Sequence, residues 1–90
     1  MKSRATARFR NLLTELPPEV QHSAKRAFKT WLVNPSHPSL EFKKLRGTKR
    51  PTYSARVGIH WRAVAVRNGG DYIWFWIGSH SDYDKLVAAI

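Results

Sequence analysis

Two strand-like segments near the C-terminus flank a tight turn, and this arrangement constrains the fold more than any other feature. Residues 61–67 and 72–77 are rich in β-branched and aromatic side chains, and Asn68-Gly69-Gly70-Asp71 lies between them. Glycine adopts the positive φ that short hairpin turns require. The pattern therefore predicts an antiparallel β-hairpin, which commits the C-terminal part of the chain to a sheet.

The N-terminal third has helical periodicity instead. Apolar residues recur at helical spacing within residues 9–16, and Thr6 is a candidate N-cap. Pro17 ends this helix, and a second helix is predicted from Pro18 to Leu32 or Val33. Because so short a break joins the two amphipathic helices, we expect them to form a hairpin that covers one face of the sheet.

Further elements complete a four-stranded sheet. Residues 40–45 and 53–57 are predicted as strands, with the basic loop 46–51 between them. A last helix is predicted from Asp82 to about Ala89, with Ser81 as its cap. The expected fold is a single α+β domain of residues 1–90: an N-terminal helix hairpin packed on a four-stranded, mainly antiparallel sheet, with a short C-terminal helix.

The charge points to a polyanionic partner. Sixteen lysines and arginines stand against six acidic residues, a formal charge of +10, and such a field attracts nucleic acid.

The chain has no cysteine, which excludes disulfides and thiolate chemistry. Arginines occupy the N-terminus where a signal peptide needs an apolar stretch, and no run approaches the roughly 20 apolar residues of a membrane span. We therefore expect a cytoplasmic protein without a membrane partner.

The last predicted strand has an aromatic face. Strict alternation along residues 72–77 places the aliphatic-rich odd positions against the helix hairpin and the aromatic even positions on the opposite face. Trp74 and Trp76 are therefore candidates for stacking on RNA bases. The alternative is that these rings pack beneath the last helix.

The residues able to do chemistry suggest phosphodiester cleavage without a cofactor. The four histidines lack metal-ligand spacing, and no paired carboxylate or P-loop is present. The 2′-hydroxyl of RNA can attack its own phosphodiester if the protein neutralises charge and moves a proton. The candidate catalytic residues are Arg56, Arg62, His80, Tyr83 and Lys43. The candidate RNA-contacting cations are Lys44, Arg46, Lys49 and Arg50.

Each candidate also has a structural alternative. Arg62 could form an ion pair with Asp82 or Asp84, His80 could only support the cap of the last helix, and Tyr83 could close the end of the core. The cations between positions 43 and 50 could serve only as a solvated surface.

The sequence resembles the RelE/ParE superfamily of bacterial toxin–antitoxin toxins in four successive segments. They are similar to the family's helical N-terminal half, its K-L-x-G turn, its Y-x-x-R-x-G-x-x-R strands and its closing strand. In this chain they read FRNLLTELPPEVQHSAKRAFKTWLVNP, HPSLEFKKLRG, YSARVGIHWRAV and IWFWIGSHSDYDKL.

The resemblance implies a toxin that a cognate acidic antitoxin neutralises. Its ribonuclease branch cuts mRNA in the ribosomal A site without a cofactor, whereas other members inhibit DNA gyrase and have no nuclease activity. By motif, the working residues of the ribonuclease branch fall on Arg56, Arg62, Lys43 or Lys44, Arg46, His80 and Tyr83. A catalytically inactive module that binds RNA or antitoxin is the remaining alternative.

The sequence differs from the family pattern in three places, and each difference leads to an expectation about the structure or the site. The usual first strand is reduced to a stub within residues 2–6. Lys43 is the nearest equivalent of a glutamate base that some ribonuclease members place before the K-L-x-G turn. Asp82 and Asp84 could partly neutralise the arginines.

Overall fold

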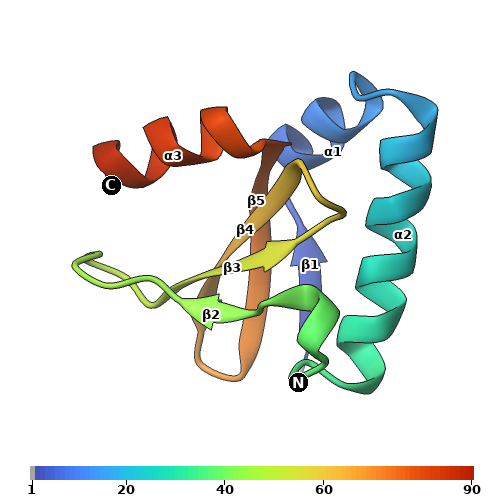
Figure 1. Cartoon of the computed structure of the whole chain (residues 1–90). Helices are drawn as coiled ribbons and strands as arrows, with labels where there is room; N and C mark the ends of the chain where they lie inside the picture. Colours follow the sequence, from blue (N-terminus) through green and yellow to red (C-terminus); the bar gives the residue numbers. More distant parts are fainter. Residues whose placement is uncertain (1) are drawn as a thin grey trace.

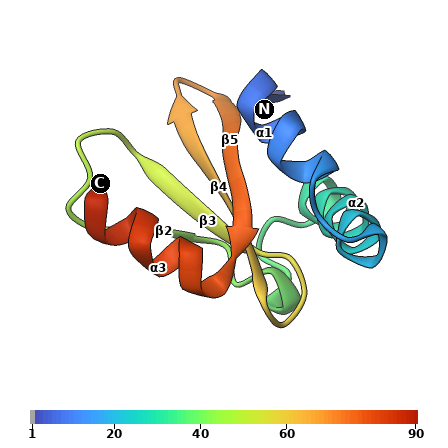
Figure 2. The same ribbon diagram turned by 90° about the horizontal axis from the view of Figure 1, so that it is seen from above.

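A five-stranded sheet separates the two N-terminal helices from a C-terminal helix (Figures 1 and 2). The two N-terminal helices lie at a steep angle to each other, so the expected antiparallel hairpin is not formed. The computed structural model describes residues 2–90. The strands are β1 (Lys2–Ala5), β2 (Lys43–Lys44), β3 (Thr52–Arg56), β4 (Trp61–Asn68) and β5 (Asp71–Ser79), in the order β1-β5-β4-β3-β2. The helices are α1 (Ala7–Thr14), α2 (Pro18–Val33), the short 3-10 helix η1 (Pro38–Leu40) and α3 (His80–Ala89). The predicted α+β class is confirmed, with one strand more than expected.

The N-terminal helices begin and end where local chemistry predicts. The side chain of Thr6 accepts a hydrogen bond of 3.1 Å from the backbone N–H of Phe9, which satisfies one of the free donors at the start of α1. Pro18 is the first residue of α2, where the missing N–H costs nothing. None of the helices formed by residues 2–90 combines the length and the apolar character of a membrane span.

The N-terminal stub forms a complete edge strand. β1 runs parallel to β5, with Lys2 opposite Asp71 and Ala5 opposite Trp74. The indole N–H of Trp74 also donates to the hydroxyl of Ser3 at 3.0 Å. The sheet is therefore mainly antiparallel, as predicted, with a parallel pairing at this edge.

The strand predicted over residues 40–45 is mostly replaced by other structure. His37 caps η1 by accepting a hydrogen bond from the N–H of Ser39 at 3.1 Å. Glu41 then adopts a left-handed backbone conformation with φ 43° and ψ 43°, which interrupts any extended segment. Only Lys43 and Lys44 pair with β3.

A β-bulge in β5 redistributes the aromatic residues between the two faces of the sheet. Val64 lies opposite Trp76 and Ala65 lies opposite Trp74, so Phe75 is an extra residue without a partner on β4. An extra residue reverses the alternation of side chains. Strict alternation, which would place Trp74 and Trp76 on one face, is therefore wrong for this strand.

Each tryptophan belongs to a different hydrophobic core. Trp74 packs on the side of α1 and α2 with Trp31 and Ile77, whereas Trp76 packs on the side of α3 with Val64 and Tyr83. Only 6% of Trp74 and 7% of Trp76 is exposed. Stacking on RNA bases needs an exposed ring face, so that interpretation is wrong for both residues. The alternative of packing beneath the last helix holds for Trp76 but not for Trp74, which packs on the opposite face.

Gly78 is required by the close approach of the Trp76 ring. The strand β5 continues through Gly78 to Ser79, although the sequence suggested an end at the glycine. A Cβ atom at position 78 would lie 2.6 Å from Cζ2 and 2.8 Å from Cη2 of Trp76. Because that ring is buried, it cannot move aside without repacking the core beneath α3.

We expect Gly78→Ala to lower the free energy of unfolding by about 1–3 kcal/mol, the usual cost of overpacking a core. Urea denaturation followed by tryptophan fluorescence measures the change. Gly70→Ala is the matched control, because among residues 2–90 no atom lies within 4 Å of its added Cβ, and its effect should stay within about 0.5 kcal/mol. Equal midpoints for the two variants would contradict the proposed contact.

Candidate active site

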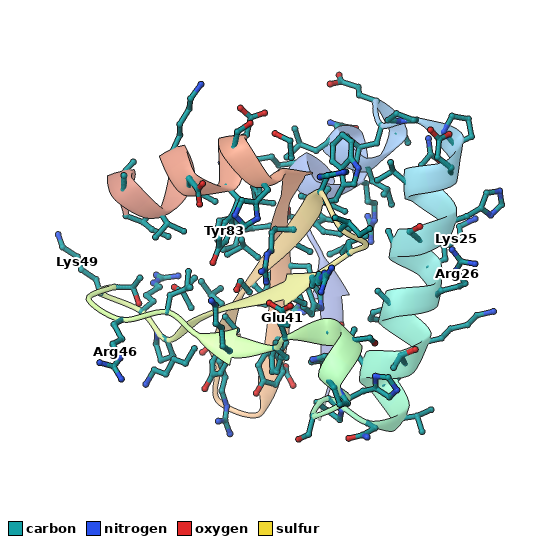
Figure 3. All side chains as sticks on the ribbon, viewed as in Figure 1. Lys25, Arg26, Glu41, Arg46, Lys49 and Tyr83 are labelled. Carbon is teal, nitrogen blue, oxygen red and sulfur yellow. The ribbon has the colours of Figure 1, made fainter. Side chains whose placement is uncertain are left out.

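Two arginines on neighbouring strands converge on one carboxylate. In the register of β3 and β4, Arg56 lies directly opposite Arg62, so both side chains emerge on the same face of the sheet. Arg56 Nη1 lies 2.9 Å from Glu41 Oε2, and Arg62 Nη2 lies 3.0 Å from Glu41 Oε1. Each carboxylate oxygen thus accepts a charge-assisted hydrogen bond from a different guanidinium group. Figure 3 shows Glu41 in the segment between η1 and β2.

The two arginines differ in their surroundings. The side chain of Arg62 is only 9% exposed, whereas that of Arg56 is 34% exposed. The Arg62 guanidinium lies 5.6 Å from the ring centroid of Tyr83, a cation–π contact. Its Nη1 atom is buried and has no hydrogen-bond partner among residues 2–90. Arg62 is therefore held rigidly and keeps a free donor.

The carboxyl group of Glu41 is held in its charged form. The hydrogen bond and the positive charge of Arg62, with a smaller contribution from Arg56, lower the pKa of Glu41 below its usual value. Glu41 therefore stays ionised at pH values where an ordinary glutamate begins to bind a proton. While it is held by both arginines, it is a weak proton acceptor.

Glu41 is the site residue that the sequence interpretation missed. Lys43 was expected to stand where some relatives have a glutamate, but the carboxylate is present two residues earlier. The structural alternative in which Arg62 pairs with Asp82 or Asp84 is also wrong, since Arg62 pairs with Glu41. One clue lay in the sequence, because Glu41 is the only acidic residue between Glu19 and Asp71.

The neighbouring lysines divide between the two faces of the sheet. Lys43 pairs with Ser54, whose hydroxyl contacts Tyr83 of α3, so Lys43 shares the face of the arginines. Lys44 pairs with Tyr53, which stacks on Phe42 on the side of α1 and α2. The structure therefore places Lys43 beside the arginine pair and Lys44 on the opposite face, against the expectation that both meet RNA there.

The loop between β2 and β3 carries the remaining predicted cations. Arg46, Lys49 and Arg50 are exposed, and none of them pairs with a carboxylate within the described part of the chain. Figure 3 shows the side chains of Arg46 and Lys49 projecting from this loop. Their charges are therefore available to a ligand that lies along the loop.

His80 and Tyr83 take different positions at the start of α3. Ser79 caps this helix by accepting a hydrogen bond from the N–H of Asp82 at 3.2 Å, so the cap lies two residues before the predicted Ser81. His80 is the first residue of α3, and its half-exposed imidazole lies 3.7 Å from Asp84 and 5.8 Å from the Tyr83 ring. The imidazole is therefore accessible to solvent, and it lies beside the Tyr83 ring that Arg62 also contacts.

Tyr83, in contrast to His80, is buried. It is 7% exposed, and its hydroxyl donates to Ser54 Oγ at 3.1 Å. Figure 3 shows it between α3 and the sheet. In this arrangement the Tyr83 ring packs against the Arg62 guanidinium and closes the core under α3. This agrees with the alternative in which Tyr83 only closes the end of the core. It has no free hydroxyl to offer a substrate.

A tetrahedral anion fits the chemistry of this cluster. Paired guanidinium groups bind phosphate and carboxylate oxygens with directed hydrogen bonds. Lys43 and the loop cations extend the positive surface beyond them, as a chain of phosphates would require.

A sequence profile of the ParE-like toxin domain matches residues 18–85.

The chain belongs to the ParE-like toxin domain family, within the RelE/ParE superfamily.

Solved structures share the fold of this ParE-like domain. A chain of a RelB–RelE antitoxin–toxin complex from Methanococcus jannaschii is 23% identical, with a TM-score of 0.70 over 90% of this chain and 95% of that one. An archaeal RelE–RelB complex from Pyrococcus horikoshii gives 17% identity and a TM-score of 0.69, over 87% and 92%. YafQ from E. coli gives 13% and 0.65, over 91% and 96%. No curated protein matches the sequence significantly.

Proposed function

We propose that this ParE-like domain is the toxin of a toxin–antitoxin system and that it cleaves messenger RNA on the ribosome. The convergence of Arg56 and Arg62 on one anion, on a face lined by unpaired cations, is the observation that carries the proposal. The family membership supports the toxin role.

The proposed mechanism uses the RNA itself as the nucleophile. The 2′-hydroxyl gives its proton to a water molecule and attacks the adjacent phosphorus to form a 2′,3′-cyclic phosphate, while the bond to the 5′-oxygen breaks. Arg56 and Arg62 bind the phosphate oxygens, where negative charge grows in the transition state. His80 is the exposed group able to give a proton to the leaving 5′-oxygen. Lys43 and the cations at 46, 49 and 50 hold the flanking phosphates.

An acidic antitoxin is the proposed partner. The relatives from Methanococcus jannaschii and Pyrococcus horikoshii were solved with RelB, and YafQ was solved with DinJ. The charge of +10 on this chain favours a partner of opposite sign. We infer that an acidic segment of the antitoxin lies along the Arg56–Arg62 face and excludes RNA from it.

A gyrase inhibitor is the second candidate, and the state of Tyr83 favours it. With this hydroxyl bonded to Ser54 and both arginines paired to Glu41, the face resembles a binding surface as much as a catalytic one. The same state is compatible with an inactive module that binds RNA or antitoxin.

Mapping of RNA ends in cells separates these functions. We expect induction of the protein to produce new 5′ ends within translated reading frames, because the A site presents the codon to the toxin. A reporter transcript that lacks its start codon is the matched control and should stay intact. Intact mRNA together with DNA breaks would select the gyrase function, and intact mRNA and DNA would select the inactive module.

A further inference from the structure

The carboxylate of Glu41 occupies the position that the proposed function assigns to a phosphate. Its two oxygens lie 2.9 Å from Arg56 Nη1 and 3.0 Å from Arg62 Nη2. A phosphodiester offers two non-bridging oxygens to the same pair of donors. Glu41 and RNA therefore cannot satisfy both arginines in this way at once.

Arg62 shows that a carboxylate leaves the site incomplete. Its Nη1 is buried without a hydrogen-bond partner in the described chain, residues 2–90, although Nη2 of the same group is bonded. Buried donors of this kind are rare, and each one left without a partner destabilises the protein. A phosphate group has more oxygens than a carboxylate and can accept from both nitrogens. The free donor thus points to a ligand larger than the Glu41 carboxylate.

The segment that carries Glu41 is suited to release it. Glu41 is the one non-glycine residue with positive φ among residues 2–90, at 43°, a left-handed conformation that is unfavourable for a residue with a side chain. Its side chain is 45% exposed. The carboxylate can therefore move into water without opening the core, while Arg62 remains fixed by the Tyr83 ring.

We propose that Glu41 is a displaceable place-holder of the phosphate site. In the free protein its carboxylate keeps Arg56 and Arg62 aligned and excludes weakly bound anions. A backbone phosphate of single-stranded RNA, held also by the loop cations, displaces it and takes the free donor of Arg62. This inference rests on the proposed function for its ligand, but it concerns binding and not cleavage.

A non-cleavable RNA tests the proposal directly. A short 2′-O-methyl oligoribonucleotide with a fluorescent label is titrated with wild-type protein and with Glu41→Gln at low salt and neutral pH. If the unoccupied site is populated about a tenth of the time in the wild type, removing the competitor raises the affinity about tenfold. Glu41→Ala should give the same gain, so the result does not depend on one substitution.

Matched variants separate displacement from a general change in charge. Glu19→Gln removes the same charge from the first turn of α2, away from the arginine pair, and should raise the affinity less than twofold. Adding Arg62→Ala to Glu41→Gln should abolish the gain. Equal or weaker binding by both Glu41 variants, with their folds intact by circular dichroism, overturns the proposal. Tighter binding without mRNA cleavage in cells would keep the proposal and overturn the nuclease function instead.

Discussion

Arg62→Ala is expected to lower mRNA cleavage by about 100- to 1000-fold, the range found when a preorganised donor to a developing negative charge is removed. Arg62 is the better fixed of the two arginines, because its guanidinium is nearly buried against the Tyr83 ring and stays there when Glu41 is displaced. A group held in place before the reaction needs no reorganisation as charge develops. Cleavage of a defined mRNA in a purified translation system measures the loss.

Arg67→Ala is the matched control for charge and strand. Arg67 also lies on β4, where its guanidinium covers the Tyr72 ring and donates to the Gly69 carbonyl in the hairpin turn. The substitution Arg67→Ala therefore removes the same charge from the same strand, at the end away from Glu41. We expect cleavage to fall less than about threefold, as for a surface cation that only steers RNA.

Arg62→Lys isolates the geometry from the charge. A lysine keeps the positive charge but lacks the planar fork that reaches two oxygens, so an intermediate loss is expected. The fold of each variant is checked by circular dichroism, because Arg62 contributes to the packing over Tyr83. Cleavage by folded Arg62→Ala at the wild-type rate would remove this residue from the site.

The elements that the sequence predicts well are those specified by neighbouring residues. Thr6 and Pro18 determine the starts of α1 and α2 through contacts within a few positions. The Gly69 turn fixes the β4–β5 hairpin in the same way, with φ of 62° at the glycine. The bulge at Phe75 has no such local origin, because it is defined by the register of β4 on β5. Alternation alone could not reveal it.

The candidate site also contains some contacts that neighbouring residues specify and others that depend on residues far apart in the sequence. Arg56 and Arg62 lie opposite each other because β3 and β4 are consecutive antiparallel strands. A local sequence motif can therefore predict that their side chains lie close together. Glu41 reaches these arginines from 15 and 21 residues away, through a left-handed turn after η1. The burial of Tyr83 likewise depends on Ser54, 29 residues away. Such contacts are set by the packed sheet and have no periodic signature in the chain.

Trp31→Ala should be the most destabilising substitution on the helical side, with a loss of about 3–5 kcal/mol in the free energy of unfolding. Trp31 is 1% exposed and joins α2 to the sheet. Its ring centroid lies 5.7 Å from that of Phe42, 5.2 Å from that of Tyr72 and 5.4 Å from that of Trp74. Such edge-to-face contacts add to the free energy of burial.

The neighbourhood of Trp31 cannot easily close around a truncated side chain. A largely apolar cavity of about 210 Å³ already lies between the helices and the sheet, and it is lined by Trp31 together with the small residues Ala24 and Ala27. Removing the indole enlarges this cavity, and poorly relaxed cavities give the largest losses. Its N–H has no hydrogen-bond partner among residues 2–90, so the loss comes from packing and not from a broken hydrogen bond.

Urea denaturation followed by far-ultraviolet circular dichroism measures this loss, and Leu32→Ala provides the control on the next residue of α2. Leu32 is 50% exposed, so its truncation should change the free energy of unfolding by less than about 0.5 kcal/mol. Small domains have total stabilities of about 5–15 kcal/mol, so Trp31→Ala should leave a measurable unfolded fraction at low urea. A loss below about 1 kcal/mol would mean that α1, and not the Trp31 contacts of α2, anchors the N-terminal helices to the sheet.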